Sequence, residues 1–412
     1  MKILTIVFDL EKGGTQRAAQ VFAEGYLALG NDSKVLAMYD LGSRYEEIKS
    51  QMHVWHGISQ DTIKAISIWQ PEIIHLHSLL LKLSDVNRII SSCPNAKIIE
   101  TNVFTKVSPW ISKVDVSFQL SYWAEWLFNL RGGKKYTSAV LPNPIKCDAF
   151  NRASDEKIKE FKQTYGIPQN AFVIGRIGQA DIGSWSTYIV NVFDQLIKTY
   201  PKAYLLLVNP PLEIVEKGKQ SRNKSQIICI PKIIGDKKLS IAYSSMDIML
   251  HILPKGETFG IVIAESILCE TPVITLSTPW FNNSQVEVVK NGIGGYVVNN
   301  KKNLIKVINK LKSGELKFDP IKAKKHIINS FDYLKVSNDA ISITMGKKNT
   351  IKPSTLKIIS ILNKSQDKPR TITTILLKTN KTFLRHFTVF TAGYKGGLDI
   401  IIAIFNFIRR KI

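Results

Sequence analysis

The feature that most constrains the fold of this 412-residue chain is an alternation of strand-length apolar runs with helical patterns. The first run, "KILTIVFDL", is followed by Gly13 and Gly14 and then by a helical pattern, "TQRAAQVFAEGYLALG". Three further runs have strand length: "SKVLAMYDL", "PEIIHLHS" and "AKIIETNVF". Strands that alternate with helices indicate a parallel sheet, so we expect an α/β protein.

A second series of the same kind begins after residues 140–154, "VLPNPIKCDAFNRAS", which contain two prolines and no periodicity. Its expected strands are "AFVIGRIG", "AYLLLVNPP", "SQIICIPK" and "MDIMLHILP", and "STYIVNVFDQLIKTY" is its first helix. The length and an apolar content of 44% support two full-sized cores. We therefore predict domains at residues 1–148 and 149–330, followed at 331–412 by a crossover helix and a basic tail.

The apolar run at the N-terminus spans only residues 3–8, too short for a signal-peptide core. No run reaches the roughly 20 apolar residues that span a bilayer. The four cysteines show neither paired nor metal-like spacing. These observations predict a cytoplasmic protein that is soluble or peripheral to the inner face of the membrane.

The formal net charge is +23, which predicts an anionic partner. Residues 341–412 hold about 14 basic and 2 acidic residues, roughly half of the excess. Their last segment, "LDIIIAIFNFIRRKI", suits either an anionic membrane surface or a final helix packed on the body. The basic residues lack interleaved aromatics, so no nucleic acid is expected.

The stretch "GETFGIVIAES" places two carboxylates eight residues apart at a strand-to-helix turn. We expect the strand to end at His251 and the helix to begin at about Gly260, with Glu257 before it and Glu265 in its first two turns. Eight helical residues turn about 800°, so both acids can reach one cleft. A carboxylate near a helix start also complements the dipole. However, Glu265 has apolar neighbours, and a buried carboxylate needs donors such as sugar hydroxyls.

This stretch, with "CETPVIT" and "TPWFNNSQVEVVKNGIGGYVV" after it, resembles the donor-binding segment of retaining glycosyltransferases of family four. The resemblance extends back through "VLPNP", "ETNVF", "IHLHS" and "KGGTQR", over about residues 1–340. It implies a GT-B fold, in which two Rossmann-like, doubly wound domains face a cleft, here with a basic C-terminal extension.

The resemblance also implies roles for individual residues. Glu265 would bind the ribose hydroxyls of the nucleotide, and Gly14 would allow close approach of the diphosphate. Glu257 would hold the transferred sugar, together with the backbone of Phe259, Gly260 and Ile261. Arg176 would neutralise the departing phosphate, which makes Arg176 and Glu257 the catalytic candidates. No nucleophile, metal or other cofactor is expected, and the nucleotide-sugar would be a substrate.

One departure from the resemblance concerns "GRIGQADIGSWS", which has Ser184 where a lysine is expected to join Arg176 on the diphosphate. Losing one charge-assisted contact costs on the order of 1.5–3 kcal/mol. Lys255, next to the two-glutamate stretch, is a candidate substitute for the missing cation.

Three residues near the ends of the second pair of strands are candidates for the acceptor side of the cleft. His77 lies at the end of the strand in "IHLHS", and Glu100 and Asn102 lie toward the end of the next expected strand, "AKIIETNVF". For His77, a core histidine is the alternative explanation.

These features predict a retaining, nucleotide-sugar-dependent glycosyltransferase of the hexosyltransferase class. Its acceptor would be a saccharide or a lipid-linked molecule in cell-surface polysaccharide synthesis. The alternative is a non-catalytic GT-B relative that binds nucleotide as a partner subunit.

Overall fold

The computed structural model describes residues 1–349 except 12, 78, 79 and 280, together with residues 358, 360 and 365. Nearly all of the basic tail, including the apolar run at 398–412, therefore lies outside the described residues. Within the described part, no helix is both long and apolar enough to cross a bilayer.

The first domain contains a sheet of seven described strands, and every pairing in it is parallel. In spatial order the strands are β3 (Val54–His56), β2 (Asp32–Asp40), β1 (Lys2–Asp9), β4 (Ile73–His77), β5 (Lys97–Asn102), β6 (Val116–Gln119) and β7 (Ser138–Val140). The helices between these strands are α1 (Gly14–Ala28), α2 (Tyr45–Lys49), α3 (Gln60–Trp69), α4 (Leu83–Ser92) and α5 (Tyr122–Leu130). The strand order reverses between β1 and β4, and such a reversal opens a crevice at the carboxyl edge.

The second domain repeats this design with six described parallel strands. In spatial order they are β10 (Ile227–Ile230), β9 (Ala203–Val208), β8 (Phe172–Ile177), β11 (Ile248–His251), β12 (Val273–Leu276) and β13 (Gly295–Val298). Its helices are α6 (Asp155–Thr164), α7 (Tyr188–Leu196), α8 (Leu212–Lys219), α9 (Asp236–Ser244), α10 (Ile261–Leu268), α11 (Gln285–Val289), α12 (Asn303–Lys312) and α13 (Pro320–Phe331). Here the order reverses between β8 and β11.

Buried apolar strands explain why the second sheet is covered by helices on both faces. Every residue of β8 is buried, as is nearly all of β9, and such runs are typical of parallel strands. Helices α9, α10 and α13 pack on one face of the second sheet, and α7 and α12 pack on the other. The doubly wound arrangement predicted from the sequence is therefore confirmed.

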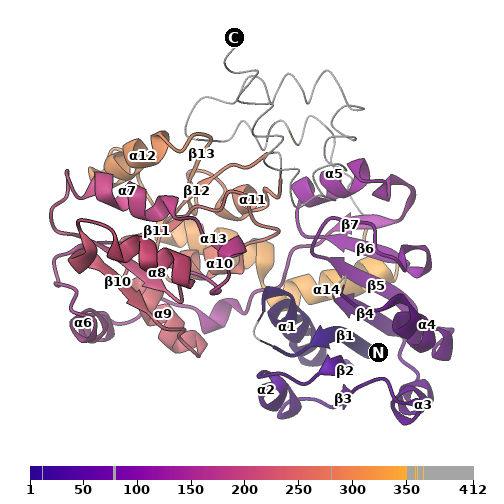
Figure 1. Cartoon of the computed structure of the whole chain (residues 1–412). Helices are drawn as coiled ribbons and strands as arrows, with labels where there is room; N and C mark the ends of the chain where they lie inside the picture. The colour runs from indigo at the N-terminus through magenta and orange to yellow at the C-terminus, as the bar shows by residue number, and fades with distance from the viewer. Residues whose placement is uncertain are drawn as a thin grey trace.

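After the second domain the chain returns to the first domain. Helix α13 belongs to the second domain, whereas α14 (Tyr333–Thr344) packs against α1, as Figure 1 shows. The two connections run side by side: the Ile145 amide donates to the carbonyl of Phe331 (2.8 Å), and the Tyr333 amide donates to the carbonyl of Ile145 (3.0 Å). The predicted boundary at 148/149 lies between the end of β7 and the start of α6.

Candidate functional site: an interdomain cavity

A cavity of about 390 Å³ lies between the two domains, at the carboxyl edges of both sheets. It is formed by the start of α1, by α2, by the loops after β8, β9 and β10, by α9 and by the first turns of α10. The residues on its first-domain side are Gly13, Gly14, Arg17, Arg44 and Glu47. The main polar residues on the other side are Gln179, Asn209, Lys232, Asp236, Tyr243 and Glu265. Ligands of open parallel sheets bind at this position.

The α1 side of the cavity presents a helix start that can accept an anion. Gly13 precedes the helix and supplies no side-chain cap, so amides of the first turn remain available. Gly14 is exposed, and a Cβ placed on it would meet no atom within 4 Å. Open space therefore lies in front of Gly14 at the start of α1.

Two arginines project into the cavity from the first domain. Arg17 pairs across the domains with Asp236 (Nη2 to Oδ2, 2.7 Å), and Arg44 donates to Oε1 of Gln20 (2.9 Å). Burial and the nearby charge of Arg17 lower the pKa of Arg44. Two close, partly buried cations favour a multiply charged anion as the ligand.

Glu265 lies on the wall opposite these arginines, on α10. Its carboxylate accepts a hydrogen bond from the Tyr243 hydroxyl (2.8 Å to Oε2), and only 8% of the residue is exposed. Burial raises the pKa of Glu265 to about 7, against the lowering effects of the Tyr243 hydrogen bond and of Arg17. A carboxylate with a strongly shifted pKa in a cleft is a candidate binding group.

The turn before α10 requires glycine where the sequence has it. Gly256 has φ +63°, and a Cβ there would come within 1.8 Å of the Asn282 carbonyl oxygen. Gly260 has φ +98° and precedes the helix. Helix α10 begins at Ile261, and Ile261 and Glu265, which lie about one helical turn apart, both line the cavity. Phe259, before the helix, is instead buried against Phe331.

Arg176 and Glu257 do not line this cavity. They form a separate cluster with His251, the last residue of β11, in which Arg176 and His251 are buried and Glu257 is partly exposed. Arg176 donates through Nη1 to Nδ1 of His251 and through Nη2 to the carbonyl of Ser184 (2.9 Å). Oε1 of Glu257 lies 2.9 Å from Nε2 of His251. Burial lowers the pKa of Arg176 to about 10, although the charge of Glu257 raises it.

The structure also shows the surroundings of Ser184, which replaces the expected lysine, and of Lys255, its candidate substitute. The Ser184 hydroxyl donates to a carboxylate oxygen of Asp181, and its carbonyl holds Arg176. The side chain of Lys255 is exposed and does not line the cavity. In the described structure, Lys255 therefore does not occupy the place of the expected lysine.

The acceptor-side candidates are all buried in the first domain, away from the cavity lining. His77 is fully buried beside His75 and Phe22, and burial lowers its pKa to about 3. Glu100 accepts hydrogen bonds from Trp110 Nε1 (3.0 Å) and Ser117 Oγ (2.6 Å).

Asn102 donates to the carbonyl of Lys106 (2.7 Å). These contacts give His77, Glu100 and Asn102 packing and structural roles in this conformation.

The titration of Glu265 gives a prediction for the protein without ligand. Because burial raises its folded pKa to about 7 from the ordinary 4.5, its contribution to folding is most favourable below pH 4.5 and is lost as the pH rises through 7. Relative to wild type, Glu265→Gln should therefore gain on the order of 1–3 kcal/mol of unfolding free energy between pH 4.5 and 8. Urea unfolding of both proteins between pH 4.5 and 8 measures the difference in their unfolding free energies. A difference that does not change with pH would contradict the raised pKa of Glu265.

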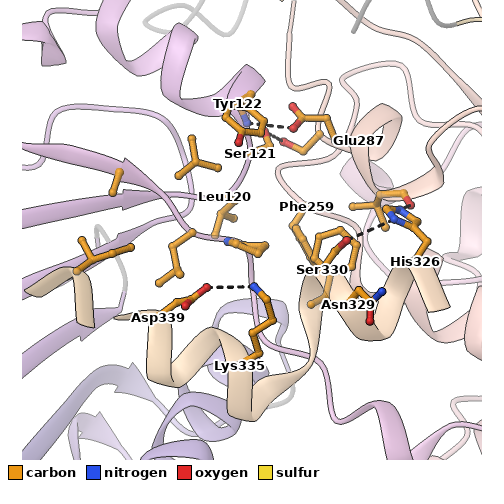
Figure 2. A pocket seen from close by; sticks show the side chains of 18 of the residues that line it. Leu120, Ser121, Tyr122, Phe259, Glu287, His326, Asn329, Ser330, Lys335 and Asp339 are labelled. Carbon is orange, nitrogen blue, oxygen red and sulfur yellow. Dashed lines mark hydrogen bonds and ion pairs between the residues drawn. The ribbon is translucent and has the colours of Figure 1, made fainter. Parts of the chain in front are cut away.

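A second interdomain cavity, of about 430 Å³, lies beside the connections between the domains. Figure 2 shows Glu287 of α11 pointing across it to the start of α5. The Glu287 carboxylate accepts from the backbone amides of Tyr122 (3.1 Å) and Trp123 (2.9 Å), and Ser121 and Ser284 hydroxyls meet at 2.7 Å. A carboxylate from one domain thus caps a helix of the other.

Removing this cap is expected to weaken the docking of the domains. Glu287→Ala should lower the unfolding free energy by about 1–3 kcal/mol, because two partly buried amides lose a charged acceptor. Glu287→Gln, which retains one acceptor, should lose less. The matched control is Glu160→Ala on the exposed face of α6, expected to stay within about 0.5 kcal/mol of wild type. Equal effects of Glu287→Ala and the control would show that the cap does not stabilise the protein.

Comparison with known proteins finds one family model and several structures of similar fold. Residues 157–330 match the model of the family described as glycosyl transferases group 1. A search of curated protein sequences found no match.

Among solved structures, HepE from Anabaena in complex with UDP-glucose is similar, with a TM-score of 0.68 and 14% identity over 84% of this chain and 100% of that chain. A glycosyltransferase from Rickettsia africae has a TM-score of 0.67 and 19% identity over 85% of this chain and 99% of its own. The lipopolysaccharide outer core galactosyltransferase WaaB has a TM-score of 0.60 and 14% identity over 83% and 99%. This likeness confirms the predicted GT-B fold.

Proposed function

We propose that this chain is a retaining glycosyltransferase that uses a nucleotide-sugar, a proposal supported by the match of residues 157–330 to the group 1 glycosyltransferase model. The observation that carries the proposal is the interdomain cavity, where Arg17 and Arg44 face Glu265 between two helix starts. Such a site offers cations and amides to a diphosphate and a carboxylate to hydroxyl groups. HepE, which is similar in fold, has been solved with UDP-glucose.

The predicted residues then take the following parts. Gly14 and the start of α1 would hold the diphosphate, and Glu265 would accept hydrogen bonds from the ribose. Arg176 would stabilise the charge that develops on the leaving phosphate once the donor is bound. Glu257, with the backbone from Phe259 to Ile261, would hold the sugar. The step would proceed without a covalent carboxylate intermediate and without a metal.

The acceptor in this proposal is a saccharide or a lipid-linked molecule of the cell envelope. WaaB and WaaG, which are similar in fold, are named for lipopolysaccharide, and the net charge of +23 suits an anionic membrane surface. The enzyme would then act at the cytoplasmic face as a peripheral protein.

The test is a transfer assay with labelled UDP-, GDP- and TDP-sugars and lipid-linked acceptors. The proposal predicts nucleotide release and a labelled product from at least one donor, with the anomeric configuration of the donor retained in the product by NMR. Release with an inverted product would overturn the retaining mechanism, and no transfer from any donor would overturn the enzymatic function.

A non-catalytic, nucleotide-binding partner subunit remains the second candidate, because Ser184 supplies no cation and the guanidinium of Arg176 is already engaged. Ser184→Lys separates the two candidates. An active wild type should gain about tenfold or more in kcat/KM if the new lysine reaches the diphosphate. A wild type that binds nucleotide without turnover, and gains turnover in Ser184→Lys, would instead identify the degenerate relative.

A further inference from the structure

His251 is the last residue of β11, one of the two strands between which the strand order of the second sheet reverses. Its ring is fully buried and lies between the Arg176 guanidinium and the Glu257 carboxylate. Nδ1 faces Nη1 of Arg176, and Nε2 lies 2.9 Å from Oε1 of Glu257. A hydroxyl of the next strand, Thr275 Oγ1, donates to the His251 carbonyl (2.9 Å) and holds the backbone there.

The two neighbours determine where the ring carries its proton. A guanidinium can only donate hydrogen bonds, so Nδ1 must present its lone pair to Arg176. The proton of the neutral ring is then on Nε2, the ring nitrogen that lies close to the Glu257 carboxylate. The Glu257 contact is a close electrostatic one, and Nε2 has no aligned hydrogen-bond partner within the described residues.

The neutral His251 ring separates the Arg176 guanidinium from the Glu257 carboxylate, so the two charges do not form a direct ion pair. Arg17, for comparison, contacts a carboxylate of Asp236 directly at 2.7 Å. Arg176 instead contacts a ring nitrogen and a carbonyl oxygen, and no carboxylate pairs directly with it in the described part of the chain. The positive charge of Arg176 is therefore less compensated than that of an arginine paired with a carboxylate. An anion that binds beside Arg176 is stabilised more strongly as a result.

We infer that His251 is a positioning residue that links Arg176 and Glu257 and orients each for a different end of the donor. Through Nδ1 it directs the guanidinium, which acts on phosphate, and through Nε2 it directs the carboxylate, which acts on the sugar. This inference rests on the proposed function, and its geometric part can be tested without it.

Two substitutions separate the two contacts. In His251→Asn, the side-chain oxygen near the Nδ1 position can still accept from Arg176, but no group reaches Glu257. In His251→Gln, the amide near the Nε2 position can still donate to Glu257, but the acceptor for Arg176 is lost. His326→Asn is the control, because His326 is a partly buried histidine of the same domain that contacts the Val288 carbonyl (3.0 Å) instead.

Nucleotide affinity and turnover should respond differently in the two variants. With UDP, GDP and TDP as probes, His251→Gln should bind the preferred nucleotide about tenfold or more weakly, because it loses a hydrogen bond to a charged group. His251→Asn should bind it within about threefold of wild type and lose at least about tenfold in kcat/KM for the sugar donor. General damage to the fold would instead lower nucleotide affinity and kcat/KM equally in both variants, and that result would overturn the inference. Unchanged affinity and unchanged kcat/KM in both variants would also overturn it.

The tautomer of wild-type His251 provides a second measurement that requires no ligand. Proton–nitrogen correlation NMR of labelled protein should show an unprotonated Nδ1 and a protonated Nε2, with the signal assigned by its absence in His251→Asn or its shift in Glu257→Gln. A protonated Nδ1 would overturn the inference. If wild type binds none of the nucleotides, the proposed function fails, and the tautomer alone then decides whether His251 bridges the two charges.

Discussion

Replacing Arg176 by methionine is expected to lower kcat/KM for the sugar donor by about 10²–10³-fold, the loss typical of removing one group that stabilises a developing negative charge. Arg176 is 2% exposed, and burial lowers its pKa to about 10, so its guanidinium remains protonated at neutral pH. In such a site, a cation contributes more to stabilising phosphate than it would in water. The measurement is steady-state nucleotide release on wild type and variant.

The Arg176 variants also separate charge from geometry. Arg176→Lys keeps the charge but cannot reach both His251 and the carbonyl of Ser184, so we expect an intermediate loss. Circular dichroism and the unfolding midpoint establish that each variant is folded. A folded Arg176→Met with kcat/KM within about threefold of wild type would remove Arg176 from the catalytic role.

Replacing Glu265 by alanine is expected to weaken nucleotide binding by about 10²-fold. The carboxylate lies in the cavity wall, where two ribose hydroxyls can donate to it, and each hydrogen bond to a charged group contributes about 1.5–3 kcal/mol. Glu265→Gln retains an acceptor for Tyr243 or for one hydroxyl, so its loss should be smaller. Calorimetric titration with nucleoside and with nucleoside diphosphate measures both variants.

The comparison of the two ligands identifies what Glu265 contacts. If the carboxylate binds ribose, the nucleoside and the diphosphate should lose affinity by the same factor. A loss confined to the diphosphate would mean that Glu265 acts by arranging Arg17 across the cavity. Unchanged affinity for both ligands would contradict the ribose role.

The sheets were predictable where single strands carry long apolar runs. Strands β1, β8 and β11 are such runs, and each was placed within about two residues of its observed bounds. Strands β3, β6 and β7 were missed because they are three or four residues long and, unlike the four-residue β11, do not lie within a longer apolar run. "VWH", "VSFQ" and "SAV" are too short to show periodicity, and they form through pairing with neighbouring strands.

The sequence predicted a residue of the candidate site only where its position depends on the helix that contains it. Glu265 lies in the first two turns of α10, as expected, and it faces the cavity. Arg44 and the pairing of Arg17 with Asp236 depend on contacts between distant segments, which a sequence pattern does not contain.

His251 was correctly placed at the end of its strand, but its role depends on side-chain orientation. Glu257 shows the same limit. Its loop was predicted, yet its carboxylate turns toward His251 instead of lining the cavity with Glu265.

The most direct test of the central claim, that the interdomain cavity binds a nucleotide-sugar, is calorimetric titration of wild type and Glu265→Ala with UDP, GDP and TDP. We predict that one nucleotide binds wild type with one-to-one stoichiometry and binds Glu265→Ala about 10²-fold more weakly. Binding of none of the three, or equal binding to both proteins, would contradict the claim.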